Sequence, residues 1–507
     1  MLLNWPFLIL WGSFGFVVTC AAVPLCKKLA VKYNVVARPG GRRIHSNPIP
    51  LLGGAAIFLP VALLICLYFV LILLDKLVVS QDYGFQMMSL FVGTGCIFIL
   101  GVVDDKYSIA WKKKILGQLL AVAILVVGGH GLDIASIPFV GPVEFGWFGI
   151  PLFALVIVVI TNAINLLDGL DGLAGGVCFF AAMTSGIIGV AKGDWFVASV
   201  GFTISGSLVG FLCFNFPPAS IYMGDGGSLT LGFLLGTLAT SCAAIAPGQR
   251  SGTMGMVVIP FLPLGLALLD VFLAVLRRWI SGRHIFVADS DHLHHRLMEK
   301  FRFPSRVVLI YYVFTAFLSG MTLWIVLGHG SAFNLHFLSL FALVVVGVIV
   351  LLRLYRIETF SKTLENRPHF RFLSSYQTFM SRRVQRAGCF DEVISLLESG
   401  VRDLGFNRVE VFQNGSSIRR WDNPQKVHAD APQSNGEKRL DKADLAVVWT
   451  VPTHTSKTYQ RFLELSWYRF LNELESRVQL LCPPELAAPD TDSLDMSSAL
   501  RWRSLPD

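Results

Sequence analysis

Long apolar stretches alternate with short polar ones along roughly the first 355 residues of the chain. The apolar stretches approach the ~20 residues that an α-helix needs to cross the hydrocarbon core of a bilayer. The pattern predicts eleven transmembrane helices, at about residues 4–25, 51–74, 87–103, 115–130, 148–167, 173–191, 195–214, 227–246, 253–275, 306–327 and 333–352. No basic segment precedes the first apolar stretch, which is typical of a retained helix and not of a cleaved signal peptide.

The pattern changes abruptly near residue 356. Beyond it Arg, Glu, Asp, Gln and Ser are frequent, and no apolar stretch is long enough to span a membrane. The periodicity of "FDEVISLLESGVRDLGF" and "TYQRFLELSWYRFLNELESRVQLL" predicts amphipathic helices, and "RVEVFQ" and "LAVVWTV" are typical of short strands. The segment "QKVHADAPQSNGEKRLDKAD" is predicted to be a loop, and the chain from about Pro483 to be disordered.

These elements predict the domain organisation. Residues 1–356 form a polytopic membrane domain, residues 357–482 a small cytoplasmic α+β accessory domain, and residues 483–507 a tail. The predicted fold class is therefore an all-α polytopic membrane protein that carries a small α+β C-terminal domain. The accessory domain shows no catalytic constellation, so regulation, or contact with a regulatory partner, is its expected role. A partial GAF-like or PAS-like sensor fold stays open.

The composition agrees with a membrane domain. Hydrophobic residues make up 54% of the 507 residues and charged residues only 15%, whereas about a quarter of a soluble domain is charged. The nine cysteines lie mostly inside apolar stretches, without a CxxC pair or a zinc-like spacing. They are typical of small core residues and argue against a disulfide framework.

The net charge of +8 is distributed unevenly along the chain. Basic residues gather in the loops within residues 26–43, 106–114 and 277–306. They are rare in the alternate loops, which carry only Lys76, Lys192 and Arg250. By the positive-inside rule the basic loops are cytoplasmic, so the N-terminus lies outside and the C-terminal domain inside. The charge is thus primarily a topology signal for a multi-pass membrane protein, with no nucleic-acid partner expected, and it would also attract phosphate ligands. The membrane is expected to be the inner, cytoplasmic one.

Five polar stretches interrupt the apolar pattern, and all of them fall on the predicted cytoplasmic side. They are "RPGGRRIHSNPIPLLGG", "ILGVVDDKYSI" with Asp104 and Asp105, "NAINLLDGLDGLAGG" with Asp168 and Asp171, "IYMGDGGSLTLGF" with Asp225, and "DSDHLHHRL" after the ninth span. A carboxylate at the centre of a membrane helix costs about 2.5–3.5 kcal/mol on insertion scales. Several of them near one interface therefore predict an aqueous site there.

The spacing of these residues suggests how they are used. Asn165, Asp168 and Asp171 recur every three residues, which on an α-helix aligns them along one stripe that can face one cleft. Asp104 and Asp105 are adjacent and so about 100° apart, which favours different roles, one holding a cation and the other positioning a nucleophile. Carboxylate and amide oxygens suit Mg²⁺. The glycines of "GDGGS" would let backbone N–H groups approach a phosphate at a helix N-terminus.

Each motif alone also has a purely structural interpretation. The aspartate pair could belong to a loop at a helix end, and the aspartates of "DGLDG" and "GDGG" could cap helices. The lysines at 112–114 could be interfacial anchors, and "HLHH" could be a surface cluster, since it lacks the i, i+4 spacing of a helical zinc site. Their joint occurrence on one predicted face favours a shared site for phosphate chemistry.

Four motifs in order carry a resemblance to a known family. "GVVDDKYSI", "NAINLLDGLDGLAGG", "IYMGDGGSLTLGF" and "DSDHLHHRL" resemble those of the polyprenyl-phosphate N-acetylhexosamine-1-phosphate transferases, over about residues 1–355. The resemblance implies transfer of a sugar-1-phosphate, most simply GlcNAc-1-phosphate, from a UDP-sugar to undecaprenyl phosphate, with release of UMP and with Mg²⁺ as cofactor. The product would be the first lipid-linked sugar of a cell-surface polysaccharide, as in cell-wall, lipopolysaccharide or O-antigen biogenesis.

The resemblance also implies residue roles. Asp225 and Asn165 match metal ligands, and Asp104 and Asp105 match the catalytic pair, to which Asp168 is added. The substrate-binding residues are Lys114, Gly169, Leu170, Asp171, Tyr222, His292, His294, His295 and Arg296. Gly169, Leu170 and Asp171 resemble a uracil-binding segment, Tyr222 an aromatic that stacks on the base, and Lys114 and the histidines contacts to phosphates or nucleotide. A deprotonated lipid phosphate is favoured as nucleophile over an aspartyl intermediate, because phosphoryl transfer chiefly needs alignment and charge neutralisation.

Other functions stay open at this point. "HLHHR" is more similar to the initiators of O-antigen, common-antigen and teichoic-acid assembly than to the muramoyl-pentapeptide-phosphate transferases, whose "GTPTMGG" stretch stands where this chain has "NPIPLLGG". A CDP-alcohol phosphotransferase would need an arginine that "DGLAGG" lacks. A transporter of an anionic substrate would be expected to show paired halves, and no repeat is visible. The hexosamine, the prenyl length, the pathway and the oligomeric state, homodimer or otherwise, are not determined.

Overall fold

The computed structural model describes two separate parts of the chain. The described residues are 5–37, 48–77, 80–132, 134–137, 141–243, 259–280, 297–298, 303–327, 367–404, 406, 408–413, 416–422, 433–440, 445–452, 463, 467 and 470–475. The chain divides into two compact units, Met1–Leu276 with Phe286–Tyr355, and Arg277–Ile285 with Arg356–Asp507. Each unit has a hydrophobic core of its own.

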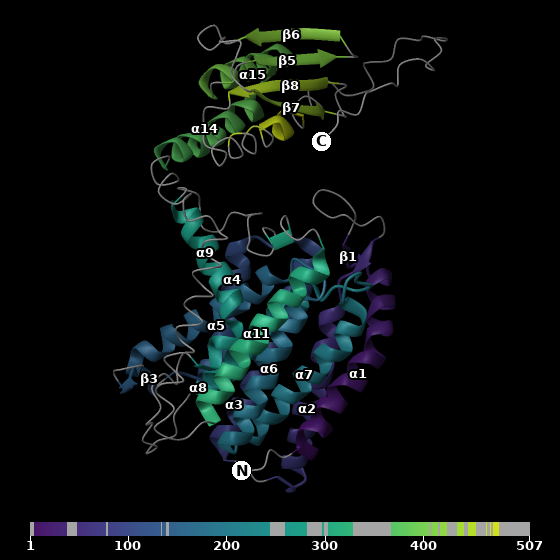
Figure 1. The fold of residues 1–507 in the computed structure, drawn as a ribbon, viewed down its shortest axis with the longest axis vertical. Helices are drawn as coiled ribbons and strands as arrows, with labels where there is room; N and C mark the ends of the chain where they lie inside the picture. Colours follow the sequence, from purple (N-terminus) through teal and green to yellow (C-terminus); the bar gives the residue numbers. More distant parts are fainter. Residues whose placement is uncertain are drawn as a thin grey trace. The chain divides into compact units, whose positions relative to one another are not determined.

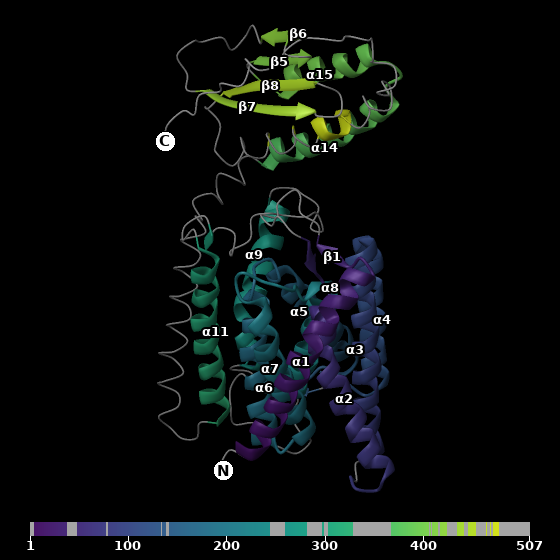
Figure 2. The same ribbon diagram turned by 90° about the vertical axis from the view of Figure 1, so that its right-hand side faces the viewer.

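The first unit is a bundle of helices (Figures 1 and 2). They are α1 (Trp5–Lys32), α2 (Gly53–Leu73), α3 (Gln81–Tyr107), α4 (Trp111–Val127), α5 (Gly149–Leu167), α6 (Leu173–Lys192), α7 (Trp195–Asn215), α8 (Gly224–Ala243), α9 (Gly265–Ile280) and α11 (Pro304–Leu327). Among the described residues, 8 helices are long and apolar enough to cross a membrane, while α4 and α9 are shorter. The chain is a multi-pass membrane protein. The predicted span at 333–352 lies outside the described residues.

Two small hairpins, which the predicted all-α membrane domain did not include, interrupt the bundle. β1 (Val36–Ala37) pairs antiparallel with β2 (Ile49–Pro50), and β3 (Ile134–Ile137) pairs with β4 (Gly141–Glu144). Figure 1 shows β1 at the end of the bundle opposite the N-terminus. β2 leads directly into α2, so it fixes where that helix begins.

Small residues let α8 pass through the middle of the bundle. The membrane-length window of this helix is 94% buried, more than that of any other candidate span in the described residues. A Cβ added at Gly232 would lie 2.5 Å from the Cα atom of Thr161 on α5, and one at Gly227 would lie 2.8 Å from the Cα atom of Gly54 on α2. Such close backbone approach is how membrane helices gain packing contacts without a hydrophobic driving force.

The second unit combines helices with an antiparallel sheet. It contains α14 (Arg367–Arg386), α15 (Phe390–Leu404), β5 (Arg408–Gln413), β6 (Ser416–Asp422), β7 (Gln433–Leu440) and β8 (Leu445–Pro452). The sheet order is β6-β5-β8-β7. The segments predicted as strands are β5 and β8, and the helix predicted from "FDEVISLLESGVRDLGF" is α15. α14 and β6 were not predicted.

β7 corrects one sequence prediction. It lies inside the segment 425–444, which was predicted to be a loop because it is polar and carries no alternation of apolar residues. β7 nevertheless pairs with β8 along its whole length, from Gln433 opposite Pro452 to Leu440 opposite Leu445. Strand formation here depends on a neighbouring strand and not on the local sequence.

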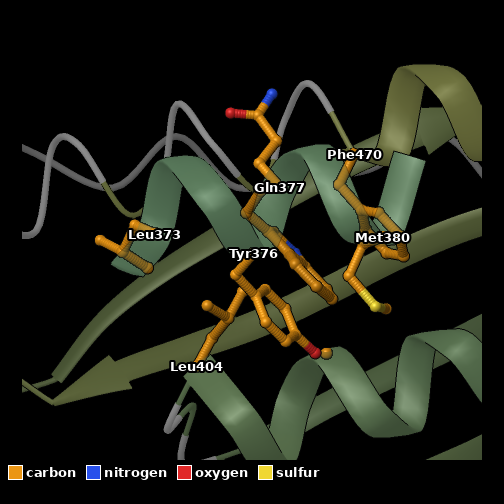
Figure 3. A pocket seen from close by; sticks show the side chains of 8 residues that line it. Leu373, Tyr376, Gln377, Met380, Leu404 and Phe470 are labelled. Carbon is orange, nitrogen blue, oxygen red and sulfur yellow. The ribbon is translucent and has the colours of Figure 1, made fainter. Parts of the chain in front are cut away.

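Alternate residues of the central strands face the core of the second unit. Val409 and Val411 on β5, and Val447 and Trp449 on β8, are almost fully buried. A small pocket lies against α14, and most of the side chains that line it are apolar. Leu373, Tyr376 and Met380 of that helix contribute to its wall, together with the polar Gln377 (Figure 3). The pocket lies in this unit and is not part of the site described below.

A bulkier residue at position 232 tests the packing of α8. We expect Gly232→Val to destabilise the protein by about 1–3 kcal/mol, because the added side chain would meet the backbone of α5. The measurement is the apparent midpoint of thermal unfolding in detergent at one fixed scan rate. Gly320→Val on α11 is the matched control, since no atom lies within 4 Å of a Cβ placed there. Equal midpoints for the two variants would contradict the prediction.

Candidate functional site

The ammonium group of Lys114 joins polar side chains from three other helices. Its Nζ lies 2.7 Å from Oδ2 of Asp104 and 2.6 Å from Oδ2 of Asp225. It also donates to Oδ1 of Asn165 at 3.4 Å. The side chains of Lys114 and Asp104 are only 15% and 10% exposed, so water screens their ion pair less than a surface pair. Residues of α3, α4, α5 and α8 thus meet at one positive charge.

Asn165 holds the carboxylate of Asp225 from the other side, and Ser228 holds Asn165. The Nδ2 group of Asn165 donates to Oδ1 of Asp225 at 2.9 Å and to Oγ of Ser228 at 2.9 Å. The hydroxyl of Ser228 in turn donates to the backbone oxygen of Gly224, one turn earlier on α8. Both oxygens of Asp225 therefore have a partner, and its position is determined by two neighbouring helices.

The carboxylate of Asp104 also shapes the turn between α3 and α4. Ser108 ends α3 in the left-handed conformation with φ of 52°, and the backbone N–H of Ile109 donates to Oδ1 of Asp104 at 2.6 Å. This turn lets α4 begin at Trp111. Asp104 thus supports the turn with one oxygen and contacts Lys114 with the other.

Asp105 caps the N-terminus of α8. Its Oδ1 accepts the N–H of Asp225 at 2.8 Å, and its Oδ2 accepts the N–H of Gly226 at 3.0 Å. A carboxylate at this position satisfies unpaired N–H groups and interacts favourably with the helix dipole. Gly224 has φ of +70°, and a Cβ there would lie 2.5 Å from Oδ2 of Asp105, so this position requires glycine.

This cap corrects the expected use of "GDGGS". The sequence predicted that its backbone N–H groups would approach a phosphate, but those of Asp225 and Gly226 donate to Asp105. The N–H of Gly227 donates to the backbone oxygen of Met223 at 3.2 Å. The glycines instead allow α8 to approach α2 and α3 closely.

The single helical stripe predicted for Asn165, Asp168 and Asp171 is wrong. α5 ends at Leu167, and Asp168 is its C-cap residue. The chain then turns, with Gly172 at φ of +76°, before α6 begins. Gly169 and Gly172 favour such a turn over a continued helix, so of the three predicted residues only Asn165 projects from α5.

Asp171 lies in this turn and contacts the loop between α7 and α8. Its Oδ2 accepts the backbone N–H of Ala219 at 2.9 Å. Asn215 ties the same two segments, because it accepts the N–H of Gly172 at 2.9 Å and donates to the backbone oxygen of Ile221 at 2.8 Å. The turn that carries Asp168 and Asp171 is therefore held beside the loop that carries Tyr222.

The other predicted residues fall in two groups. Tyr222 is half-buried, and its backbone pairs with the segment before α2, donating to Pro50 and accepting from Gly53, both at 2.9 Å. Gly169 is exposed and Leu170 half-buried beside Asp171. The remaining predicted residues lie outside the described residues; they are His292, His294, His295 and Arg296.

The side chains around Lys114 include oxygen atoms of the kind that a hard divalent cation prefers. In the structure, oxygen atoms of Asp104, Asp225 and Asn165 contact the Lys114 ammonium. Among the described residues there is no group of three or more His, Cys, Asp or Glu that could hold a metal. Mg²⁺ is commonly bound by one or two carboxylates together with substrate phosphates, which matches this donor set.

Sequence reasoning missed a buried amide pair beneath the cluster. Nδ2 of Asn162 on α5 donates to Oε1 of Gln118 on α4 at 2.7 Å, and the Gln118 side chain is 1% exposed. Gln118 lies one turn after Lys114, and Asn162 one turn before Asn165, so the pair sets the register in which those two residues meet. The sequence did contain an indication of this pair, because Gln118 and Asn162 are polar residues inside predicted spans and lie about one helical turn from Lys114 and Asn165.

Replacing both members of this pair tests its role. We expect Asn162→Leu to lower the free energy of unfolding by about 1–3 kcal/mol, because it leaves the buried Gln118 amide without this partner. Adding Gln118→Leu should restore part of the loss, with a coupling energy of about 0.5–3 kcal/mol. The measurement is the free energy of unfolding in detergent of the wild type, the two single variants and the double variant, compared in a double-mutant cycle. Additive effects of the two replacements would argue against a direct interaction.

The chain is similar to known sugar-phosphate transferases. The family model described as glycosyl transferase family 4 matches residues 87–243, which include every member of the Lys114 cluster. A "probable undecaprenyl-phosphate N-acetylglucosaminyl 1-phosphate transferase" of Bacillus subtilis is 34% identical over 335 residues, covering 64% of this chain and 87% of that protein.

Two further relatives show the breadth of the similarity. A decaprenyl-phosphate N-acetylglucosaminephosphotransferase of Mycobacterium tuberculosis is 32% identical over 374 residues, covering 69% of this chain and 89% of that protein. A phospho-N-acetylmuramoyl-pentapeptide-transferase of Acetivibrio thermocellus is 29% identical over 346 residues, covering 63% of this chain and 96% of that protein. Each relative is matched over most of its own length.

Proposed function

The chain belongs to the polyprenyl-phosphate N-acetylhexosamine-1-phosphate transferase family, and on that premise we propose that it transfers GlcNAc-1-phosphate from UDP-GlcNAc to undecaprenyl phosphate. The observation that carries the proposal is the convergence of Asp104, Asp225 and Asn165 on Lys114. The names of the relatives from Bacillus and Mycobacterium support GlcNAc as the sugar. Membership of this family leaves no support for the transporter or CDP-alcohol interpretations.

The proposed reaction is an in-line displacement at phosphorus. An oxygen of the lipid phosphate attacks the phosphorus that carries the sugar, and the bond from that phosphorus to the bridging oxygen breaks, so UMP leaves. Both reactants are anions, so the site must chiefly align them and neutralise charge. In this proposal Lys114 supplies a cation at the centre of the cluster, and Asp104 beside it would orient the lipid phosphate and accept its proton.

Mg²⁺ is proposed as the cofactor and would neutralise charge on the diphosphate when bound. Asp225 and Asn165 would hold it, with the Asp104 carboxylate alongside. Asp105 was predicted from sequence as a second catalytic carboxylate. Because both of its oxygens accept N–H groups at the start of α8, we propose that it acts instead as a positioning residue for Asp225.

The turn after α5 and the loop before α8 are proposed to bind the nucleotide. Asp171, with Gly169 and Leu170, would recognise uracil, and the ring of Tyr222 would stack on it. The contact of Asp171 with the backbone of Ala219 supports this proposal, because it brings the two segments together. Asp168, at the end of α5, is proposed to act at the phosphate end of the substrate.

Other parts of the proposal rest on the sequence alone. Four residues that follow α9 in the sequence are proposed to contact phosphates: His292, His294, His295 and Arg296. The site is proposed to open to the cytoplasm, where UDP-GlcNAc is soluble, with the N-terminus on the other side of the inner membrane. The product would begin a cell-surface polysaccharide. A muramoyl-pentapeptide donor is the alternative that the Acetivibrio relative keeps open.

UMP release by the purified full-length protein tests the reaction. We expect Mg²⁺-dependent release with undecaprenyl phosphate and UDP-GlcNAc, and little with UDP-GalNAc or UDP-MurNAc-pentapeptide. Asp104→Asn and Asp225→Asn should each lower the rate at least about 100-fold, since each removes a charge beside the reacting phosphates. Asp82→Asn, in the first turn of α3, is the control and should keep wild-type activity. Release only from the pentapeptide donor would favour the alternative, and none from folded protein would refute the proposal.

The role of Asp105 has its own test. We expect Asp105→Asn to raise the Mg²⁺ concentration for half-maximal UMP release about tenfold, because one N–H at the start of α8 loses its acceptor and Asp225 shifts. High Mg²⁺ should restore much of the rate, whereas it should not rescue Asp104→Asn. An unchanged Mg²⁺ requirement together with a large loss of maximal rate would indicate direct catalysis by Asp105.

A further inference from the structure

α14 of the second unit is a basic amphipathic helix. Its sequence, "RPHFRFLSSYQTFMSRRVQR", contains five arginines and no acidic residue. The next helix, α15, has the opposite character, because "FDEVISLLESGVRDL" carries four acidic residues and one arginine. Charge is thus segregated between two neighbouring helices of the same unit. Segregation of this kind is not needed to keep a small domain soluble.

The inner face of α14 is occupied by the core. Leu373, Met380 and Val384 are almost fully buried. Leu373 and Met380, with Tyr376, line the small pocket shown in Figure 3. The Tyr376 hydroxyl donates to Oδ2 of Asp403 on α15 at 2.7 Å. These contacts fix the rotation of α14 about its axis, so its exposed side cannot turn inward.

The exposed side of α14 presents aromatic and basic side chains together. Phe372 is 51% exposed and Phe379 is 54% exposed, and Arg382, Arg383 and Arg386 are exposed as well. At 100° per residue, these five lie within an arc of about 100° and form one stripe, here called the outer stripe. The guanidinium of Arg383 lies 5.8 Å from the ring centroid of Phe379.

The combination of phenyl rings and arginines indicates which kind of surface the outer stripe binds. Exposed phenyl rings cost free energy in water, and the charges of a solvated helix face are normally of both signs. A helix with phenyl rings and arginines on one face is typical of the boundary between lipid headgroups and acyl chains. The carboxylate of Asp403 on α15 accepts the hydrogen bond of Tyr376, and no salt bridge joins a carboxylate to an arginine of the outer stripe in the described residues.

We propose that the outer stripe docks on an anionic lipid surface of the membrane that holds the first unit. The rings of Phe372 and Phe379 would enter the headgroup boundary, and the three guanidinium groups would contact lipid phosphates. α14 begins at Arg367, shortly after the span predicted at 333–352. Because this covalent connection keeps α14 near the membrane, its effective concentration at the bilayer surface is high. A nucleic acid would also suit arginines and aromatics, but nothing tethers one to this chain. The proposal does not depend on the transferase activity.

Photocrosslinking in the full-length protein tests the proposal. p-Benzoylphenylalanine replaces Phe379, and the protein is placed in nanodiscs of phosphatidylcholine with or without phosphatidylglycerol. The matched control carries the same group in place of Ser395, which is exposed on the acidic helix α15. We expect at least about five times more lipid crosslink from position 379 than from 395, only with phosphatidylglycerol present, and less in high salt.

A charge variant isolates the electrostatic part. Each arginine near an anionic leaflet is worth about 1 kcal/mol, or about a fivefold change in binding. Arg382→Glu, Arg383→Glu and Arg386→Glu together should therefore lower the crosslink from position 379 at least tenfold. The triple lysine replacement at the same positions keeps the charge and should retain most of the crosslink. Because these side chains are exposed, neither set should disturb the core.

Three outcomes would overturn the proposal. Equal lipid yields from positions 379 and 395 would mean that the outer stripe does not meet the bilayer. A yield that does not depend on phosphatidylglycerol would exclude recognition of anionic lipid. Crosslinks to polypeptide, or to nucleic acid when the experiment is repeated in cell membranes, in place of lipid would identify a different occupant.

Discussion

The close approach of α8 to α3 is the constraint on which the candidate site depends. A Cβ at Gly101 would lie 2.5 Å from the Cα atom of Gly226, so neither helix can carry a side chain where they cross. At this distance the carboxylate of Asp105 reaches the first N–H groups of α8 and holds them. The position of Asp225 follows from that cap. A wider crossing would leave the cap, and with it the carboxylate cluster, without support.

Charge compensation is the second requirement. Two carboxylates at a membrane interface would repel each other and resist desolvation, and removing one partner from such a group leaves an uncompensated charge. The ammonium of Lys114 lies between Asp104 and Asp225 and offsets this cost, while the amide of Asn165 completes the contacts of Asp225. In the proposed reaction the same ammonium would also face the anionic phosphates, so contacts that stabilise the fold would contribute to substrate binding.

The second unit brings a different kind of chemistry to the chain. Its core is built by ordinary burial of β-branched and aromatic residues on one face of a sheet, with Val411 and Trp449 as examples. Its charges, however, are sorted by helix, with arginines on α14 and carboxylates on α15. In the proposed docking, this sorting would direct α14 toward an anionic surface without any change in the core. The first unit thus holds a partly buried ionic cluster, whereas the arginines of the outer stripe are exposed.

The sequence by itself determined most of the helices of the first unit, though not α14 of the second, because span length and hydrophobic periodicity are local properties. Its ordered motifs also identified the family, and alternation identified β5 and β8. The tertiary structure decided which motif atoms meet. α5 ends at Leu167, so Asp168 and Asp171 do not share a helical stripe with Asn165, and the first N–H groups of "GDGGS" donate to Asp105. The polar segment β7 forms a strand because it pairs with β8. These outcomes depend on partners distant in the sequence, and a local pattern carries no information about which distant group will satisfy a donor or an acceptor.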